Sequence, residues 1–143
     1  MTPLDLTRHP PRSPREHLGG LVMLPRMIDI ARAKLPGGVI GDYQIGRGMS
    51  GVVLKHFRLT ASEFVEIVAQ AGDDDGVLQK LRVGSGRTDH SRLSNVLEKL
   101  TVADVPADLR AEFQAFYGKD LPPARLVLDV LDEDDAGSFP RET

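Results

Sequence analysis

The N-terminal residues combine arginine and proline in a pattern that suits the binding of an anion. Arg12 and Arg15 alternate with prolines, and the helix expected to follow presents Arg26 and Asp29 on its charged face. A planar guanidinium matches a carboxylate or a phosphate, and prolines pre-order the backbone that presents several cations together. We therefore expect Arg12, Arg15 and Arg26 to bind an anion and Asp29 to orient one guanidinium.

A purely structural interpretation of the same residues stays open. Arg12 and Arg15 could instead pair with Asp29, with Glu16 or with the acidic C-terminal segment, because residues 101–143 hold ten Asp/Glu against four Lys/Arg. In that case the arginines clamp the arm to the body of the protein. The leading hypothesis remains a non-enzymatic binding domain for a small anionic ligand or an acidic protein partner.

Two further function classes are compatible with the sequence. His9 or His17 could transfer a proton beside the arginines, which would make the protein an enzyme acting on a phosphorylated or carboxylated metabolite. An exposed helix stripe could instead make it a structural oligomerisation module. Neither the ligand nor the partner follows from the sequence, and both a monomer and a homodimer are compatible with it.

Other motifs favour simple structural roles. Residues 46–51 match G-x-G-x-x-G, but no buried strand or βαβ unit surrounds them, so we expect a plain glycine loop. Residues 73–75 are all aspartate and suit a helix N-terminus, where carboxylates oppose the helix dipole. The acidic residues 129 and 132–135 are expected to form a solvated helix end.

Neither a metal site nor a cofactor is expected. The four histidines lack the short spacing of transition-metal ligands, cysteine is absent, and the acidic segment lacks the glycine and spacing of a calcium loop.

Composition narrows the class of protein further. The 143 residues carry a net charge of −3 and no tryptophan, so binding of nucleic acid is not expected. Residues 1–8 contain Asp5 and no apolar segment typical of a secretory signal, and no run approaches the roughly 18 apolar residues of a membrane span. Together with the absence of cysteine, these features predict a cytoplasmic protein that does not contact a membrane.

The periodicity of the apolar residues predicts an all-α fold. We expect one compact domain over residues 1–143, with five to six short helices, an extended arm over residues 1–18 packed on the core, and a polar tail over residues 136–143. The expected helices cover residues 21–35, residues 60–71 with a capping box of Thr60 and Glu63 and a C-terminal cap at Gly72, a short segment after residue 73, residues 88–100, residues 106–117, and a last helix from about residue 122. Ser50 could in addition cap a short helix that runs through Phe57. The inward stripes of the later helices are predicted to be Leu93, Val96, Leu97 and Leu100, then Leu109, Phe113, Phe116 and Tyr117.

Several N-terminal segments carry a resemblance to a known family. They are Leu4-Asp5-Leu6-Thr7, Pro10-Pro11-Arg12-Ser13-Pro14-Arg15-Glu16, Leu18-Gly19-Gly20 and the run from Leu24 to Lys34. The chain resembles a bacterial family of domains of unknown function, number 5069. The resemblance implies a small helical cytosolic protein and brings no activity with it.

Overall fold

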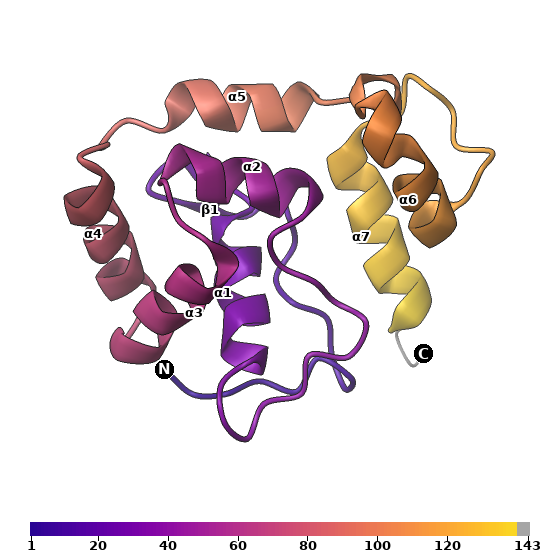
Figure 1. Ribbon diagram of the computed structural model, residues 1–143. Coiled ribbons are helices and arrows are strands. Elements are labelled where there is room, and N and C mark those ends of the chain that lie inside the picture. The colour runs from indigo at the N-terminus through magenta and orange to yellow at the C-terminus, as the bar shows by residue number, and fades with distance from the viewer. Residues whose placement is uncertain (140–143) are drawn as a thin grey trace.

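The chain folds mainly into helices, as expected. The computed structural model describes residues 1–139, which contain seven α-helices, one 3-10 turn and one two-stranded hairpin, so the helices outnumber the predicted five to six (Figure 1). The elements are β1 (His17–Leu18), β2 (Leu21–Val22), α1 (Leu24–Ala33), α2 (Gly48–His56), α3 (Ala61–Gln70), α4 (Asp74–Ser85), α5 (Ser91–Lys99), η1 (Val102–Asp104), α6 (Ala107–Tyr117) and α7 (Val127–Ser138).

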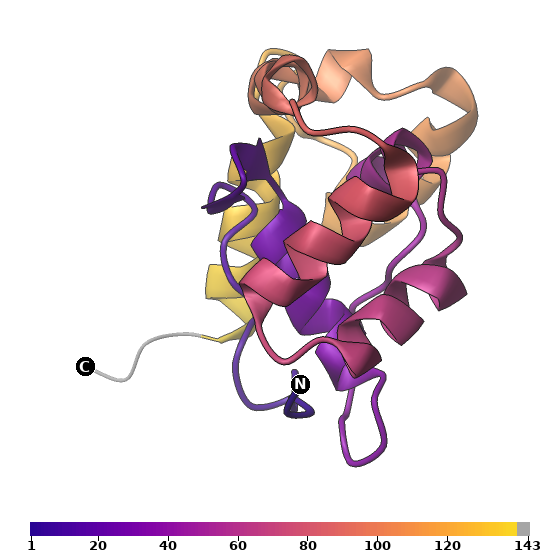
Figure 2. The ribbon, with the colours of Figure 1, turned by 90° about the vertical axis from the view of Figure 1, so that its left-hand side faces the viewer.

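Helix α1 is the centre of the molecule. It lies between α3 and α4 on one side and α7 on the other (Figures 1 and 2). Nine of its ten residues are buried, including the polar Arg26 and Asp29. A helix that is covered on all sides must bury its charges as well, and these need partners nearby.

The start of α1 differs from the prediction. We expected the helix to begin near Leu21, but Leu21 and Val22 pair with residues 17–18 in an antiparallel hairpin. Gly19 and Gly20, both with positive φ, form the turn, and Met23 also has a positive φ just before the helix. The helix therefore begins only at Leu24, and Pro25 occupies its first turn, where the missing N–H of proline breaks no helical hydrogen bond.

Local capping signals in the sequence are confirmed in α3 and α4. The Thr60 side chain accepts a hydrogen bond from the Glu63 backbone N–H, and the Glu63 carboxylate accepts one from the Thr60 N–H, at 3.2 and 3.0 Å. Asp73 caps α4 by accepting from the Gly76 N–H at 2.8 Å. The C-terminal cap of α3 is Ala71 and not Gly72.

The predicted inward stripes of α5 and α6 are partly wrong. Helix α5 starts at Ser91 and leaves Val96 54% exposed. Helix α6 buries none of its residues, and Leu109 and Phe116 are 39% and 51% exposed. These helices lie at the periphery, where each has a neighbour on one side only, so an apolar stripe wider than that contact stays in solvent.

Helix α7 also differs from the prediction. It begins at Val127 rather than near residue 122, because residues 122–126 return alongside residues 100–103 through backbone hydrogen bonds. The acidic residues 132–135 lie within the helix and not beyond its end. Of the predicted tail over residues 136–143, the first three continue the helix and residues 140–143 lie outside the described part of the chain.

The N-terminal arm is extended and packs on the core, as expected. Leu6 is buried against Ile30 and Ala33 of α1, and Asp5 forms a parallel bridge with Val39. In residues 1–139, none of the helices combines the length and the hydropathy that a membrane span requires.

Candidate functional site

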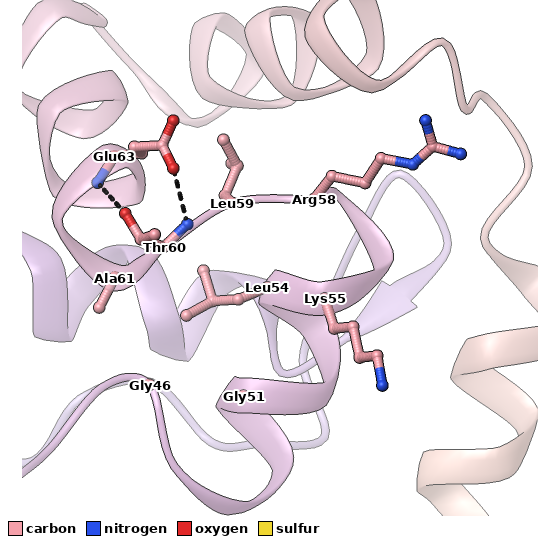
Figure 3. Close-up of a pocket in the computed structure, with 9 residues that line it drawn as sticks. All are labelled: Gly46, Gly51, Leu54, Lys55, Arg58, Leu59, Thr60, Ala61 and Glu63. Atoms are coloured by element: carbon pink, nitrogen blue, oxygen red, sulfur yellow. Dashed lines mark hydrogen bonds between the residues drawn. The ribbon is translucent and has the colours of Figure 1, made fainter.

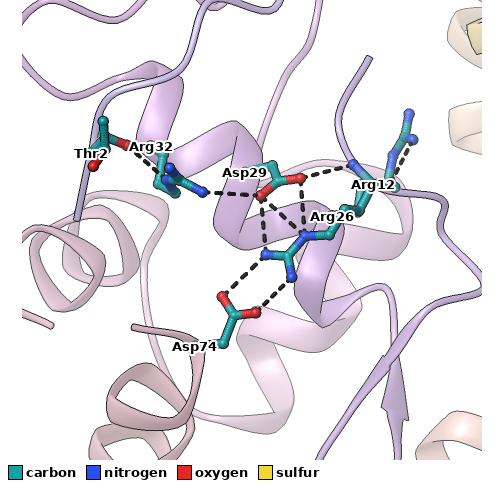
Figure 4. Close-up of polar contacts among 6 residues, drawn as sticks. All are labelled: Thr2, Arg12, Arg26, Asp29, Arg32 and Asp74. Carbon is teal, nitrogen blue, oxygen red and sulfur yellow. Dashed lines mark hydrogen bonds and ion pairs between the residues drawn. The ribbon is translucent and has the colours of Figure 1, made fainter. Parts of the chain in front are cut away.

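Arg12 of the arm lies between two carboxylates from different helices (Figure 4). Its backbone N–H donates to Asp29 at 2.8 Å, and its guanidinium contacts Asp29 of α1 at 3.0 Å and Asp74 of α4 at 2.6 Å. The hydrogen bond to Asp74, together with that to Asp29, raises the pKa of the Arg12 guanidinium. Arg12 therefore joins the arm to α1 and α4 at once.

Arg26 forms a second, more deeply buried ion pair. The residue is only 4% exposed, and its two terminal nitrogens donate to Asp135 of α7 at 2.6 and 3.2 Å. The Tyr43 hydroxyl donates to the same carboxylate at 2.7 Å, and burial with this hydrogen bond raises the pKa of Tyr43. The expected solvated end of α7 is thus wrong for Asp135, which is buried because it neutralises Arg26.

Arg15 completes the contacts between the arm and α7. Its guanidinium pairs with Asp129 and, at 3.6 Å, with Asp132. The Ser13 hydroxyl donates to Asp132 at 2.8 Å. Residues 12–15 are therefore held against three helices by charge-assisted hydrogen bonds.

The four predicted site residues are brought close to one another, but each guanidinium faces carboxylates of the protein itself. Arg12 pairs with Asp29, as both the anion-site and the clamp hypotheses required, whereas Arg26 pairs with Asp135. Of the histidines proposed for proton transfer, His9 is exposed and His17 contacts Glu98 at 3.2 Å. A ligand-binding role for the arm stays a prediction, and the geometry favours the clamp.

A different surface carries cations that lie beside a hollow. Two adjoining hollows of about 520 Å³ each share Gly46, Gly51 and Lys55, and we call them together the α2 groove. One is lined in addition by residues of the α2–α3 corner, and the other by residues of α2 and α6. The remaining lining residues are Leu54, Arg58, Leu59, Thr60, Ala61 and Glu63 for the first hollow and Arg47, Gly48, Val52, Leu109 and Glu112 for the second.

The charges of the α2 groove are not balanced within it. Within residues 1–139, Lys55 and Arg58 form no ion pair, and their side chains extend away from the ribbon (Figure 3). Arg47 pairs with Glu112 across the groove, and Glu63 is occupied by the capping box. With Arg47, Lys55 and Arg58 against Glu63 and Glu112, the lining of the groove therefore carries one positive charge in excess.

The glycine loop builds one wall of this groove. Helix α2 begins inside the loop, at Gly48, and no side chain caps its N-terminus. The expected N-terminal cap at Ser50 is wrong: its hydroxyl accepts from the Gly46 N–H at 3.0 Å and donates to the Arg47 carbonyl at 2.8 Å, which closes the loop upon itself. The glycine loop is visible in the sequence, but only the structure shows that Lys55 and Arg58 line the same hollow as Gly46 and Gly51.

A pair of histidines lies between α2 and the start of α5, with His90 buried and His56 partly buried. His56 Nε2 and His90 Nδ1 are 2.9 Å apart, and Arg82 Nε donates to His90 Nε2 at 3.4 Å. Because His90 Nε2 accepts, its Nδ1 carries the proton and donates to His56 Nε2. Both imidazoles must then be neutral, and within residues 1–139 no three His, Asp or Glu side chains gather as metal ligands would.

The histidine pair predicts a loss of stability in mild acid. Burial lowers the pKa of both imidazoles. The neighbouring charges of His56 and Arg82 lower the pKa of His90 further, while Asp89 raises it. Arg87 lowers the pKa of His56. The unfolded chain, with a histidine pKa of about 6.5, then binds more protons than the folded chain. Stability is therefore complete above about pH 6.5 and falls as the pH drops, by at most about 1.4 kcal/mol per pH unit for each histidine.

Urea unfolding between pH 7.5 and 5.5 measures this dependence. The double variant His56→Gln/His90→Gln should show a flatter profile than the wild type, whereas His9→Gln, at an exposed position, should leave the profile unchanged. Parallel profiles for the wild type and the double variant would contradict the assignment.

The fold and these contacts define a small, mostly helical domain with a charge-clamped N-terminal arm. The chain belongs to the DUF5069 family, a domain of unknown function whose family model matches residues 8–136. No curated protein matches the chain.

Proposed function

We propose that this protein is a non-enzymatic binding domain whose anion site is the α2 groove rather than the arm. The observation that supports this assignment is the contrast in charge pairing. Arg12, Arg15 and Arg26 all form ion pairs, whereas Lys55 and Arg58 form none in the described part of the chain, and Glu63, which lines the same hollow, accepts from the Thr60 N–H. An incoming anion would have to displace a carboxylate at the arm but would meet an unneutralised charge at the groove.

The size of the groove supports the same proposal. A volume of about 520 Å³ falls within the range of pockets that hold small molecules. The cytoplasmic location expected from the sequence stays part of this proposal.

A titration with pyrophosphate and with citrate tests the proposal. We expect Lys55→Gln/Arg58→Gln to weaken binding of whichever anion binds the wild type by about ten- to a hundredfold, because charge-assisted hydrogen bonds contribute roughly 1.5–3 kcal/mol each and exposure reduces that value. Isothermal titration calorimetry at fixed ionic strength measures the change.

The matched control is Lys80→Gln/Arg92→Gln, which removes two exposed cations from α4 and α5 and changes the net charge equally. Equal weakening in both double variants would show that binding depends on the net charge of the protein and not on the α2 groove. A wild type that binds neither anion would refute the proposed function.

A further inference from the structure

We propose that the ligand of the α2 groove is a small amphiphilic anion, with a phosphate or carboxylate head joined to a short apolar chain. The head contacts Lys55 and Arg58, and the chain lies over Val52 and Leu109. This inference rests on the proposed anion site and adds the chemical class of its ligand.

The apolar half of the groove is formed by two exposed aliphatic side chains from separate helices. Val52 of α2 is 47% exposed and Leu109 of α6 is 39% exposed, and both line the second hollow. Single exposed apolar residues are ordinary on a protein surface, but these two line the same hollow. A ligand chain between them would remove apolar surface of both from water.

Helical spacing places this apolar half beside the cationic half. Val52 and Lys55 are three residues apart on α2, so they share one face of the helix. Lys55 lines both hollows. Arg58 lines only the first of them and Val52 only the second. A ligand that runs along α2 would therefore meet an apolar surface first and two cations next.

Helix α6, which carries Leu109, is attached to the rest of the protein in a way that would let it adjust to a ligand. It has no buried residue, and the base of its segment is closed by hydrogen bonds between residues 100–103 and 123–127. The Arg47–Glu112 pair links α6 to the glycine loop across the groove. Because none of its residues is fully buried, a small adjustment of α6 would displace only the partly buried Phe113 and Tyr117, which pack against the core.

Hexyl phosphate and inorganic phosphate are the probes that test this class of ligand on the full-length protein. We expect hexyl phosphate to bind at least tenfold more tightly, because each methylene removed from water is worth roughly fourfold in affinity. The variant Val52→Thr/Leu109→Ser should lose most of this preference while its affinity for inorganic phosphate stays unchanged. Circular dichroism verifies that the variant is folded, which its exposed positions favour.

Val83→Thr/Val96→Thr is the matched control, since both valines are exposed on other helices. Equal affinity for the two phosphates, or equal loss of preference in both double variants, overturns the amphiphilic class and leaves the anion site standing. A protein that binds neither probe contradicts the anion site itself. Cosedimentation with anionic lipid vesicles in the absence of hexyl phosphate binding would overturn the small ligand in favour of a membrane headgroup.

Discussion

Asp135→Ala is expected to lower the free energy of unfolding by about 3–5 kcal/mol. The substitution leaves the guanidinium of Arg26 buried without its counter-charge. A buried charge has lost its hydration, and without a partner nothing offsets that loss. Tyr43 loses its hydrogen-bond acceptor at the same time. Urea unfolding followed by circular dichroism at pH 7.5 measures the change.

Asp134→Ala is the neighbouring control, because Asp134 is exposed and forms no ion pair within residues 1–139. It should change stability by no more than about 0.5 kcal/mol. Replacing both partners, as Arg26→Met/Asp135→Leu, should cost less than Asp135→Ala alone, since no charge is then stranded. A double variant less stable than Asp135→Ala would contradict this account of the pair.

Arg12→Ala is expected to cost about 2–3 kcal/mol of stability. The guanidinium contacts Asp29, whose side chain is buried, and Asp74 in α4. Its removal leaves Asp29 with the backbone N–H of residue 12 and with Arg32 at 3.8 Å, and removes the ion pair between the arm and α4. The expected value is below that of Asp135→Ala because the Arg12 side chain is 31% exposed, which screens the interaction. Thermal or urea unfolding detects a difference of this size readily.

Arg8→Ala is the control on the same arm, since the Arg8 side chain is 83% exposed and its one ion pair within residues 1–139 is with Asp5, at 3.6 Å. It should leave stability nearly unchanged. Arg12→Ala, compared with Lys55→Gln/Arg58→Gln, also tests whether the arm is a structural clamp or an anion site. If phosphate or citrate stabilised the wild type but not folded Arg12→Ala, while Lys55→Gln/Arg58→Gln responded like the wild type, the ligand site would return to the arm.

The features predicted correctly depend mostly on neighbours in the sequence. The capping box of Thr60 and Glu63 and the cap at Asp73 involve contacts within a few residues, although the local caps expected at Ser50 and Gly72 were wrong. The same holds for the mostly helical class and the extended arm, because proline content and apolar spacing act locally. The family resemblance likewise rested on contiguous N-terminal motifs.

The contacts that define the candidate sites could not be predicted in this way. Arg12 and Asp74 are 62 residues apart in the chain, and Arg26 and Asp135 are 109 apart. Apolar periodicity shows which face of a helix turns inward but not which other helix it meets. Sequence reasoning therefore found the arginines and offered several carboxylates for them, and only the packing of α4 and α7 against the arm and α1 selected Asp74 and Asp135.

The sequence by itself thus determined the helical class, the N-terminal caps of α3 and α4 and the presence of a cationic arm, because short-range hydrogen bonding and steric preference decide these. The tertiary structure decided which charges are neutralised. In the folded protein the arginines of the arm pair with carboxylates of other segments, whereas Lys55 and Arg58 form no ion pair within residues 1–139. Leu109 stays partly exposed in the same groove. The physical reason is that burial and charge pairing depend on distances between segments far apart in the chain, which no local pattern encodes.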